Sequence, residues 1–519
     1  MRLLALVFLL LTTSAHAETP GVALLGGGFD DVRRGIETLA TSGSPRAAPL
    51  LDALTAGRLF TRSNGGPVIK DGDAYADADT GIPVADAAGL RAVRSNNTVR
   101  RALEAAQGAL QLFAPDPGTR AAAAAAVFKS RDAAALPALD RAIAAEKDSS
   151  VRASMQDARA AALLARPEAA EPDRLAAIAR LRERGDLDAR AILASLPPQT
   201  PAVTAAAADA VTSIDRLLQI WNLAQAAFYG VSLGSVLLLA ATGLAITFGV
   251  MGVINMAHGE MVMIGAYVTF MVQEVIKAHV PGLFGASLFI AIPLAFLVSG
   301  GIGVLIERGL IRFLYGRPLE TLLATFGLSL VLQQAVRSLF GPTNREVGTP
   351  AWMSGYGKVG QLTLTYNRVA IIVFAVVVLF SLMAVLRYTS LGLRMRAVTQ
   401  NRRMASAMGI RTPWIDALTF GLGSGVAGMA GVALSQIDNV SPNLGQGYII
   451  DSFMVVVFGG VGNLWGTAVG ALTLGVVNKF LEPVAGAVLG KIVVLVLLIL
   501  FIQRKPRGIF PLKGRAVEA

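Results

Sequence analysis

Beyond residue 224 the chain consists almost entirely of long apolar segments, and this pattern restricts the possible folds more than any other feature of the sequence. Several segments approach the roughly 20 residues that an α-helix needs to cross a bilayer. Backbone groups in lipid must pair within the protein, so such segments predict α-helices. The segments cover residues 225–249, 258–278, 284–305, 319–340, 367–387, 412–436, 448–462, 466–482 and 487–503. We therefore predict an all-α polytopic membrane protein with about 8–9 transmembrane segments, because one or two short segments could be re-entrant.

Charged residues are concentrated in the first part of the chain. They make up 16% of the 519 residues, whereas 54% are hydrophobic, and they lie mostly before Leu217. This contrast divides the chain into a polar part, residues 18–215, and an apolar part, residues 216–519. The absence of cysteine excludes disulfides and thiolate metal sites, and three histidines are too few for a histidine-built zinc site. We expect neither a metal nor a cofactor.

The net charge of +11 fits membrane topology better than nucleic-acid binding. Lys and Arg accumulate in the cytoplasmic loops of membrane proteins. The strongly basic loops here are residues 307–317, 387–411 and 504–515. Nine crossings that start outside the cytoplasm place all of these loops inside it, so the number of crossings and the charge distribution agree.

Residues 1–17 have the pattern of a secretory signal peptide. Arg2 precedes an apolar run that is too short for a comfortable span, and the small residues around His16 follow it. An uncleaved anchor is the alternative. Cleavage after Ala17 would place residues 18–215 in a bacterial periplasm, with the apolar part as a multi-pass domain of the inner (cytoplasmic) membrane.

Residues 18–215 are predicted to form a mainly helical domain with a small β element. The segment Gly57–Asp79 has Asn-Gly and Asp-Gly turn signals between short apolar stretches, which indicates a β-meander or hairpin. From Asn96 onward, apolar residues recur at helical spacing between capping residues. Helix pairs that recur every few tens of residues suggest a HEAT-like solenoid, and an irregular helical bundle is the alternative.

No catalytic group of residues is apparent in this domain. Its carboxylates fall on charged helix faces, where we expect them to be solvated. The proline-rich segment Leu196–Pro201 and the alanine-rich run after it are interpreted as a linker to the apolar part.

Two of the apolar segments are interrupted by glycine and polar residues. Residues 249–265 read GVMGVINMAHGEMVMIG, and residues 455–470 read VVVFGGVGNLWGTAVG. Paired interruptions in the two halves of a transporter point to a substrate path. The alternative is that the glycines only allow close helix packing, as we expect for the segment Gly421–Gly431. The candidate path residues are Asn255, His258, Glu260, Gly252, Gly259, Gly459, Gly460 and Asn463.

The sequence contains no P-loop that could bind a nucleotide phosphate, so ATP-driven transport would need a separate ATPase subunit. The basic loop of residues 390–412 is suited to receive one. It is helix-forming through Ala397–Met408 and then has a glycine typical of a helix C-terminus. A simple positive-inside anchor is the alternative. The candidate coupling residues are Arg394, Arg396, Arg402, Arg403, Ala405, Ala407 and Gly409.

Four motifs together resemble the permeases of branched-chain-amino-acid-type ABC importers, in the same order along residues 225–511. They are INMAHGEMVMIGAYVTF, ERGLIRFLYGRPLETLLATFGLSLVLQQ, SLGLRMRAVTQNRRMASAMGI and VVVFGGVGNLWGTAVGALTLG. Ala405, Ala407 and Gly409 resemble a degenerate "EAA…G" loop of importer permeases, although its Glu is absent. The resemblance implies a second homologous permease, two cytoplasmic ABC ATPase subunits and a periplasmic substrate-binding protein as partners.

The polar part adds a second resemblance. Its segments GRLFTRSNGGPVIKDGDAYADADTG and NNTVRRALEAA are similar to the N-terminal extension of the urea-transporter permease, which implies urea as the substrate. Urea is neutral and polar, so a path lined by amide and imidazole groups such as those of Asn255 and His258 would suit it. Glu260 would then line the path, orient His258 or face the partner permease.

Three alternatives to a urea permease remain. The first is the same kind of importer for branched-chain amino acids or another short amide. The second is a passive channel or secondary transporter that acts alone, and the third is a membrane-anchored scaffold with the helical domain as its working part. In each case the chain itself is not expected to be an enzyme.

Overall fold

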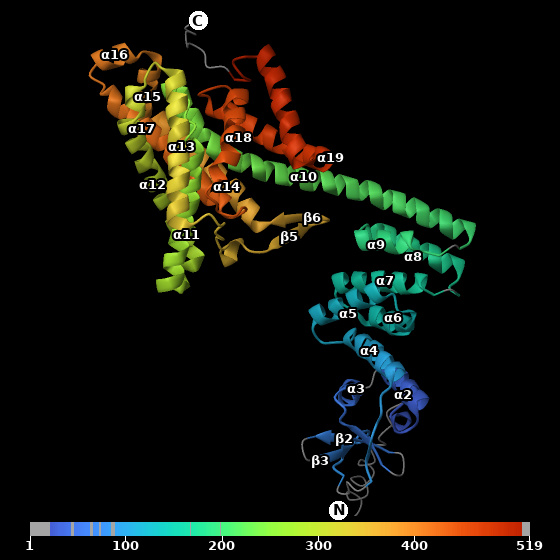
Figure 1. Ribbon diagram of the computed structural model, residues 1–519. Helices are drawn as coiled ribbons and strands as arrows, with labels where there is room; N and C mark the ends of the chain where they lie inside the picture. Colours follow the sequence, from blue (N-terminus) through green and yellow to red (C-terminus); the bar gives the residue numbers. More distant parts are fainter. Residues whose placement is uncertain are drawn as a thin grey trace, which may run out of the picture. The chain divides into compact units, whose positions relative to one another are not determined.

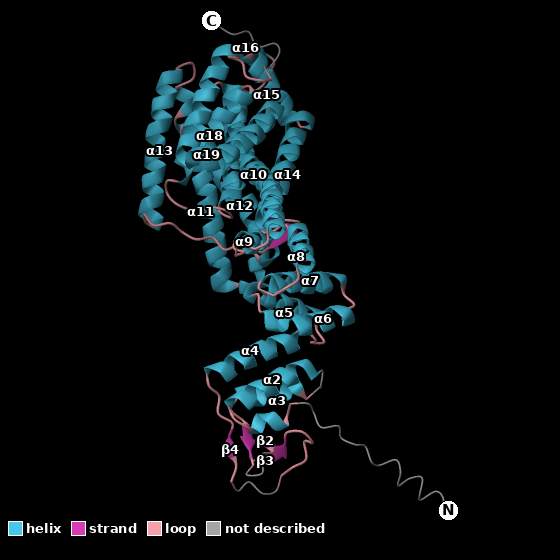
Figure 2. Cartoon of the chain, turned by 90° about the vertical axis from the view of Figure 1, so that its right-hand side faces the viewer, coloured by secondary structure: helices cyan, strands magenta, loops and turns pink. Residues whose placement is uncertain are grey.

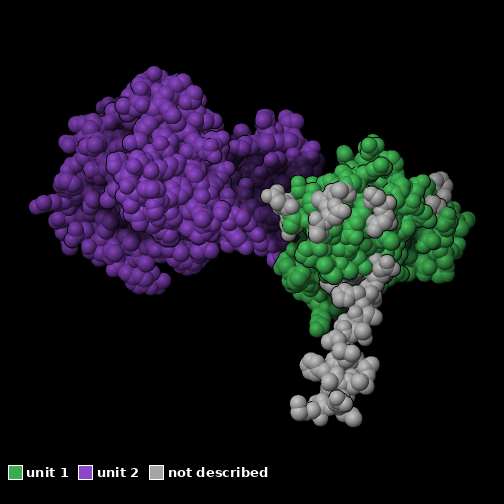
Figure 3. Space-filling model, turned by 90° about the horizontal axis from the view of Figure 1, so that it is seen from below, with its two compact units in different colours: residues 1–219 green, residues 220–519 purple. Residues whose placement is uncertain are grey.

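The computed structural model describes residues 21–510, except 43–45, 63–65, 72–73, 85–88, 167 and 198. The chain divides into two compact units, Met1–Gln219 and Ile220–Ala519, which are coloured separately in Figure 3. The predicted signal peptide lies outside the described residues.

Unit 1 begins with a small sheet packed against helices. The strands are β1 (Leu59–Thr61), β2 (Pro67–Asp71), β3 (Ala74–Asp77) and β4 (Arg91–Ala92), in the order β3-β2-β1-β4 with antiparallel neighbours. Leu59 pairs with Ile69, and Leu59 is buried against the helices η1 (Ala23–Gly26), α2 (Phe29–Ser42) and α3 (Ala47–Thr55). The predicted β-meander is therefore confirmed, although residues of both predicted turns fall outside the described part.

The rest of unit 1 is helical. It contains α4 (Asn97–Gln111), α5 (Pro117–Ser130), η2 (Ala133–Ala135), α6 (Leu136–Ala145), α7 (Ser149–Leu164), α8 (Glu171–Arg184) and α9 (Leu187–Ala194). Asp116, Asp148 and Asp186 cap α5, α7 and α9 by accepting backbone N–H bonds. Successive helices pack side by side, with α7 between α5 and α8 (Figure 1). The HEAT-like assignment stays a prediction.

Among the described residues of unit 1, two carboxylates are buried, which corrects the expectation of solvated helix faces. Glu146 is 7% exposed and accepts bonds of 2.6 and 2.9 Å from the Arg120 guanidinium. This pairing, with backbone N–H donors, lowers the pKa of Glu146 to about 2. Asp157 is 8% exposed and accepts from Arg180 at 2.6 Å and Arg184 at 3.1 Å. The packed helices cover these carboxylates, and arginines from neighbouring segments neutralise them.

The alanine-rich run after Pro201 is not a linker. It starts the 51-residue helix α10 (Pro201–Met251). Val203, Ala210 and Ile214 are each 1% exposed and belong to the apolar core of the unit 1 helices. Alanine has the highest helix propensity, and these apolar residues recur at helical spacing, so the run forms a helix with one buried face.

Unit 2 is a helical bundle. Its long helices after α10 are α11 (His258–His279), α12 (Ser287–Gly309), α13 (Pro318–Phe340), α14 (Tyr366–Tyr388), α17 (Thr412–Leu434), α18 (Leu444–Gly459) and α19 (Leu464–Arg504). The connections contain η3 (Pro281–Ala286), η4 (Ile311–Phe313), η5 (Ala351–Met353), the hairpin β5 (Tyr356–Val359) and β6 (Leu362–Thr365), α15 (Ser390–Gln400) and α16 (Arg402–Ala407).

Within the described residues, seven helices are long and apolar enough to cross a membrane, fewer than the predicted count. All predicted segments are helical, but two of them form one helix, α19, in which Gly486 has a non-helical backbone. Another segment forms α18, which has only 16 residues. The lower count therefore reflects one bent helix and one short helix.

The two ends of the bundle differ in character. The basic helices α15 and α16 and the C-terminal end of α19 lie at one end of unit 2 (the upper end in Figures 1 and 2). The basic α12–α13 connection is at the same end, because Tyr315 contacts Arg402 of α16. The hairpin β5–β6 lies toward the other end. This arrangement is the one that the charge distribution predicted.

Glycines bring the backbone of α17 into contact with three neighbouring helices. A Cβ on Gly423 would lie 2.6 Å from the Gly243 carbonyl of α10, and one on Gly431 would lie 2.0 Å from the Val262 carbonyl of α11. The α12 helix is also close, since a Cβ on Gly428 would lie 2.6 Å from the Ala295 carbonyl. The prediction of a packing face in this segment is confirmed.

Candidate functional site

The first interruption is a short stretch of irregular chain between α10 and α11. It starts at Gly252, whose φ of +68° ends α10 in a conformation that favours glycine. Its backbone is satisfied locally and by α13: the Asn255 side-chain oxygen accepts from Ala257 N at 3.0 Å, and Met256 N donates to Thr325 Oγ1 at 3.1 Å. Irregular backbone inside a bundle is tolerated when its polar groups are paired in this way.

His258 begins α11 and is fully buried. Its Nε2 lies 2.9 Å from the Ala240 carbonyl of α10. A carbonyl only accepts, so Nε2 carries the proton and donates. This bond ties α11 to α10. The interpretation that Glu260 orients His258 is therefore wrong, because the imidazole is positioned by a backbone group of another helix.

Glu260 is 1% exposed and lies two residues further along α11. Its Oε1 accepts from Ser329 Oγ at 2.9 Å and from Gln333 Nε2 at 2.8 Å, both on α13. Gln446 of α18 donates to Gln333 Oε1 at 3.2 Å. The second carboxylate oxygen of Glu260 has no partner among the described residues. Three helices thus meet in a buried cluster of neutral hydrogen-bonding groups around one carboxylate.

This cluster belongs to a longer polar stripe on α13, which we call the polar seam. Its members, at every fourth residue, are Thr321, Thr325, Ser329 and Gln333. All four are at most 5% exposed, whereas Leu319, Leu323 and Val331 on other faces of α13 are exposed. One turn beyond Gln333, Arg337 donates to Asn443 at 3.0 Å. From Thr321 to Arg337 the stripe extends about 24 Å along the helix, enough to cover most of a bilayer core.

The sequence interpretation overlooked the polar seam. The signal was present, because polar residues at every fourth position of an apolar helix share one face. Ser329 and Gln333 contact Glu260, which is 69 and 73 positions away along the chain. This contact could not be predicted from the spacing of residues.

The second interruption joins α18 and α19 and contacts the end of α10. Asn463 caps α19 by accepting from Trp465 N at 3.0 Å and Gly466 N at 3.2 Å. Gly459 packs backbone to backbone with Gly466, and a Cβ on Gly460 would lie 2.6 Å from the Phe510 carbonyl. This turn contacts the last turn of α10, just before the first interruption, because a Cβ on Gly249 would lie 2.4 Å from the Gly462 Cα.

The structure therefore brings most candidate path residues into one region. Gly259 lies within it too, since its Cβ position is 2.4 Å from the Gly445 carbonyl of α18. The glycines and Asn463 have packing or capping roles in this structure, as do Asn255 and His258. Glu260 differs, because one of its two oxygens is left without a partner.

The predicted coupling loop forms two short helices. The prediction of one continuous helix from residue 397 to 408 is wrong. Asn401 leaves the helical conformation, and its side-chain oxygen caps α16 by accepting from Met404 N at 2.9 Å. Gly409 follows α16 with φ +84°, as predicted for a helix C-terminus. Met404 and Met408 are 61% and 77% exposed. Of the coupling candidates, Ala405 is buried. The exposed ones are Arg394, Arg396, Arg402, Arg403, Ala407 and Gly409.

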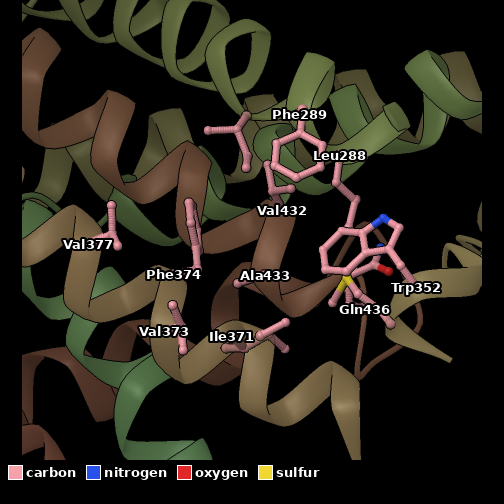
Figure 4. Close-up of a pocket in the computed structure, with 13 residues that line it drawn as sticks. Leu288, Phe289, Trp352, Ile371, Val373, Phe374, Val377, Val432, Ala433 and Gln436 are labelled. Atoms are coloured by element: carbon pink, nitrogen blue, oxygen red, sulfur yellow. The ribbon is translucent and has the colours of Figure 1, made fainter. Parts of the chain in front are cut away.

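A separate cavity of about 360 Å³ lies among α12, α14, α17 and η5 (Figure 4). Its walls are almost entirely apolar, with Phe289, Trp352 and Phe374 among the lining residues and Gln436 as a polar one. Such a surface favours an acyl chain or another apolar group over a polar solute. The polar seam is therefore the better candidate for the path of a polar substrate.

These features define a class of protein: a multi-pass membrane transport subunit with broken helices, a buried polar stripe and an exposed basic helix pair at one end. Residues 226–502 match the family model described as the branched-chain amino acid transport system permease component. The chain belongs to this family, whose members are permease subunits of ABC importers and are not themselves enzymes.

Curated relatives are similar over the same region. The chain is 32% identical to the high-affinity branched-chain amino acid transport system permease protein LivH of Escherichia coli K12 over 294 residues, which are 55% of this chain and 94% of LivH. It is 31% identical to BraD of Pseudomonas aeruginosa over 298 residues, or 56% and 96% of the two chains. A probable LivH of Methanocaldococcus jannaschii is 25% identical over 292 residues, or 53% and 88%. No solved structure matches.

Proposed function

We propose that this chain is the membrane-spanning permease subunit of an ATP-driven, binding-protein-dependent importer, with urea as its substrate. The polar seam carries the proposal. Urea is uncharged, with four N–H donors and one carbonyl acceptor. The seam offers hydroxyl and amide groups beside the Glu260 carboxylate, and no Lys or Arg is buried among the residues that the structure describes. A carboxylate oxygen that lacks a partner, as in Glu260, can accept from the amide nitrogens of urea.

The length of the chain supports urea over the substrates of its relatives. LivH and BraD align with little more than half of this chain, so some 200 residues of unit 1 lie outside the match. The N-terminal segments in this extra part resemble the extension of the urea-transporter permease. On this proposal residues 1–17 are a signal peptide, and unit 1 is periplasmic.

The proposed partners are a second homologous permease, two cytoplasmic ATPases and a periplasmic binding protein. Exposed side chains at the α15–α16 end of unit 2 form the surface for the ATPase, because flexible apolar side chains beside charge suit a groove on another protein; they are Arg394, Arg396, Arg403, Met404 and Met408. Unit 2 then lies in the inner membrane with α15 and α16 in the cytoplasm.

The second candidate substrate is a branched-chain amino acid, and it is favoured by the names of LivH and BraD. Uptake of labelled urea and labelled leucine by strains with and without this gene separates the two. We expect the gene to support urea uptake and not leucine uptake; the opposite result would replace urea by the amino acid. Urea flux through the purified chain alone in liposomes, without ATP, would instead indicate a passive channel.

The polar seam can be tested with single cysteines, because the natural chain contains none. We expect a water-soluble thiol reagent to modify Ser329→Cys and Gln333→Cys in the transporting complex roughly tenfold faster than Leu330→Cys and Val331→Cys, since polar residues inside a membrane protein mark aqueous paths. The two controls lie on the same helix, where Leu330 and Val331 are 48% and 63% exposed on the faces away from the seam. Equal protection of all four positions during turnover would exclude the seam as the path.

A further inference from the structure

A buried ion pair connects the exposed helix α16 to the membrane helix α17. Asp416 of α17 is fully buried, and both of its oxygens accept from the Arg402 guanidinium at the start of α16. Two parallel N–H bonds to one carboxylate fix orientation as well as distance. Arg402 is itself half-exposed at 44% of its side-chain surface, so it spans from the cytoplasmic surface to the buried carboxylate.

The same guanidinium reaches the neighbouring connection. It lies over the Tyr315 ring, 4.8 Å from the centroid, and the Tyr315 hydroxyl donates to Glu307 Oε1 at 2.9 Å. Glu307 is fully buried near the end of α12. A displacement of Arg402 therefore acts on α17 directly and on α12 through one aromatic side chain.

The contacts of α17 continue the connection toward the first interruption. Its Gly423 packs against Gly243 of α10, whose Cβ position is 2.9 Å from the His258 ring. Gly431 packs against the Val262 carbonyl of α11. Three residues further along α11, Gly265 packs against Gly428 of α17. These contacts are backbone to backbone, so α17 has little room to slide without moving the helices on both sides of the interruption.

We infer that Arg402 and Asp416, with Tyr315 and Glu307, form the link by which movement of α16 is transmitted to α17 and from there to the interrupted helices. The inference rests on the proposed function, because it requires an ATPase that moves α16. Arg402 and Asp416 are positioning residues: they contact neither substrate nor nucleotide.

The test compares ATP hydrolysis and urea uptake in the same reconstituted complex of permeases, ATPases and binding protein. Asp416→Asn and Arg402→Lys are expected to reduce the urea taken up per ATP hydrolysed by about tenfold, within the range of typical allosteric coupling, while hydrolysis per assembled complex stays within about twofold of wild type. A merely structural role would lower the amount of complex without changing this ratio. The matched control is Arg317→Gln, which breaks an exposed cytoplasmic ion pair with Glu320.

The outcomes are separable. A wild-type complex without uptake or stimulated hydrolysis would refute the proposed function. A wild-type complex that couples, with Asp416→Asn coupling equally well, would overturn the link alone. If Asp416→Asn does not assemble, Arg402→Lys decides, because it keeps the positive charge and loses only the two-bond geometry; an unchanged ratio in that variant also overturns the link.

Discussion

Replacing Gly265 by valine is expected to prevent stable folding of the membrane unit. A Cβ at this position would lie 2.0 Å from the Gly428 carbonyl oxygen and 2.6 Å from its Cα. Both neighbours are backbone atoms of α17, so no side chain can rotate away. Overpacking of a core typically costs 1–3 kcal/mol, and we expect about 3 kcal/mol or more here because two helices must separate.

The matched control for this change is Gly327→Val on α13. Gly327 is also inside a helix, but a Cβ there has no neighbour within 4 Å. Both variants carry the same change of helix propensity, so their difference reports the helix contact alone. The measurement is the yield of monodisperse protein in detergent together with its thermal unfolding midpoint. Equal yield and midpoint for the two variants would show that α11 and α17 do not pack this closely.

Replacing Glu260 by leucine is expected to abolish substrate uptake while the protein still inserts into the membrane. Leucine removes the acceptor for Ser329 and Gln333, and it places an apolar side chain in the polar seam. We expect uptake to fall at least about a hundredfold, since a polar solute that passes an apolar side chain leaves its own N–H donors unpaired.

Two variants isolate the role of this carboxylate. Glu260→Gln keeps one acceptor oxygen for α13, so we expect it to fold like wild type and to retain more uptake than Glu260→Leu. Leu330→Ala lies next to Ser329 on the exposed side of α13 and should leave uptake unchanged. The measurement is initial uptake rate normalised to the amount of inserted protein. Wild-type uptake by well-inserted Glu260→Leu would remove Glu260 from the path.

The parts of the fold that follow from local chemistry could be predicted. The apolar segments became helices because hydropathy and length suffice to specify a helix in lipid. The interruption that contains Gly252 and the helix end before Gly409 could be predicted because glycine readily adopts the positive φ that both positions have. The strand segment around Leu59 was visible from its turn signals.

Features that depend on distant residues could not be predicted. Glu260 was recognised as unusual, but its pairing with α13 requires the bundle to be assembled. The burial of Glu146 and the ion pair of Arg402 with Asp416 have the same origin, because each joins segments whose proximity no spacing reveals. The break at Asn401 was missed since a side-chain cap competed with an otherwise continuous helical pattern.

The C-terminal segment has a consequence for protein engineering. Ile509 N and Phe510 N donate to the carbonyls of Phe458 and Gly459, and Asn463 donates to Phe510 O. These hydrogen bonds fix residues 509–510 to the turn between α18 and α19. Truncation or a fusion junction before residue 510 would therefore loosen that turn and, through the contact of Gly462 with Gly249, the end of α10 as well. Affinity tags belong beyond Phe510, and deletion series should treat Ile509 and Phe510 as part of the folded bundle.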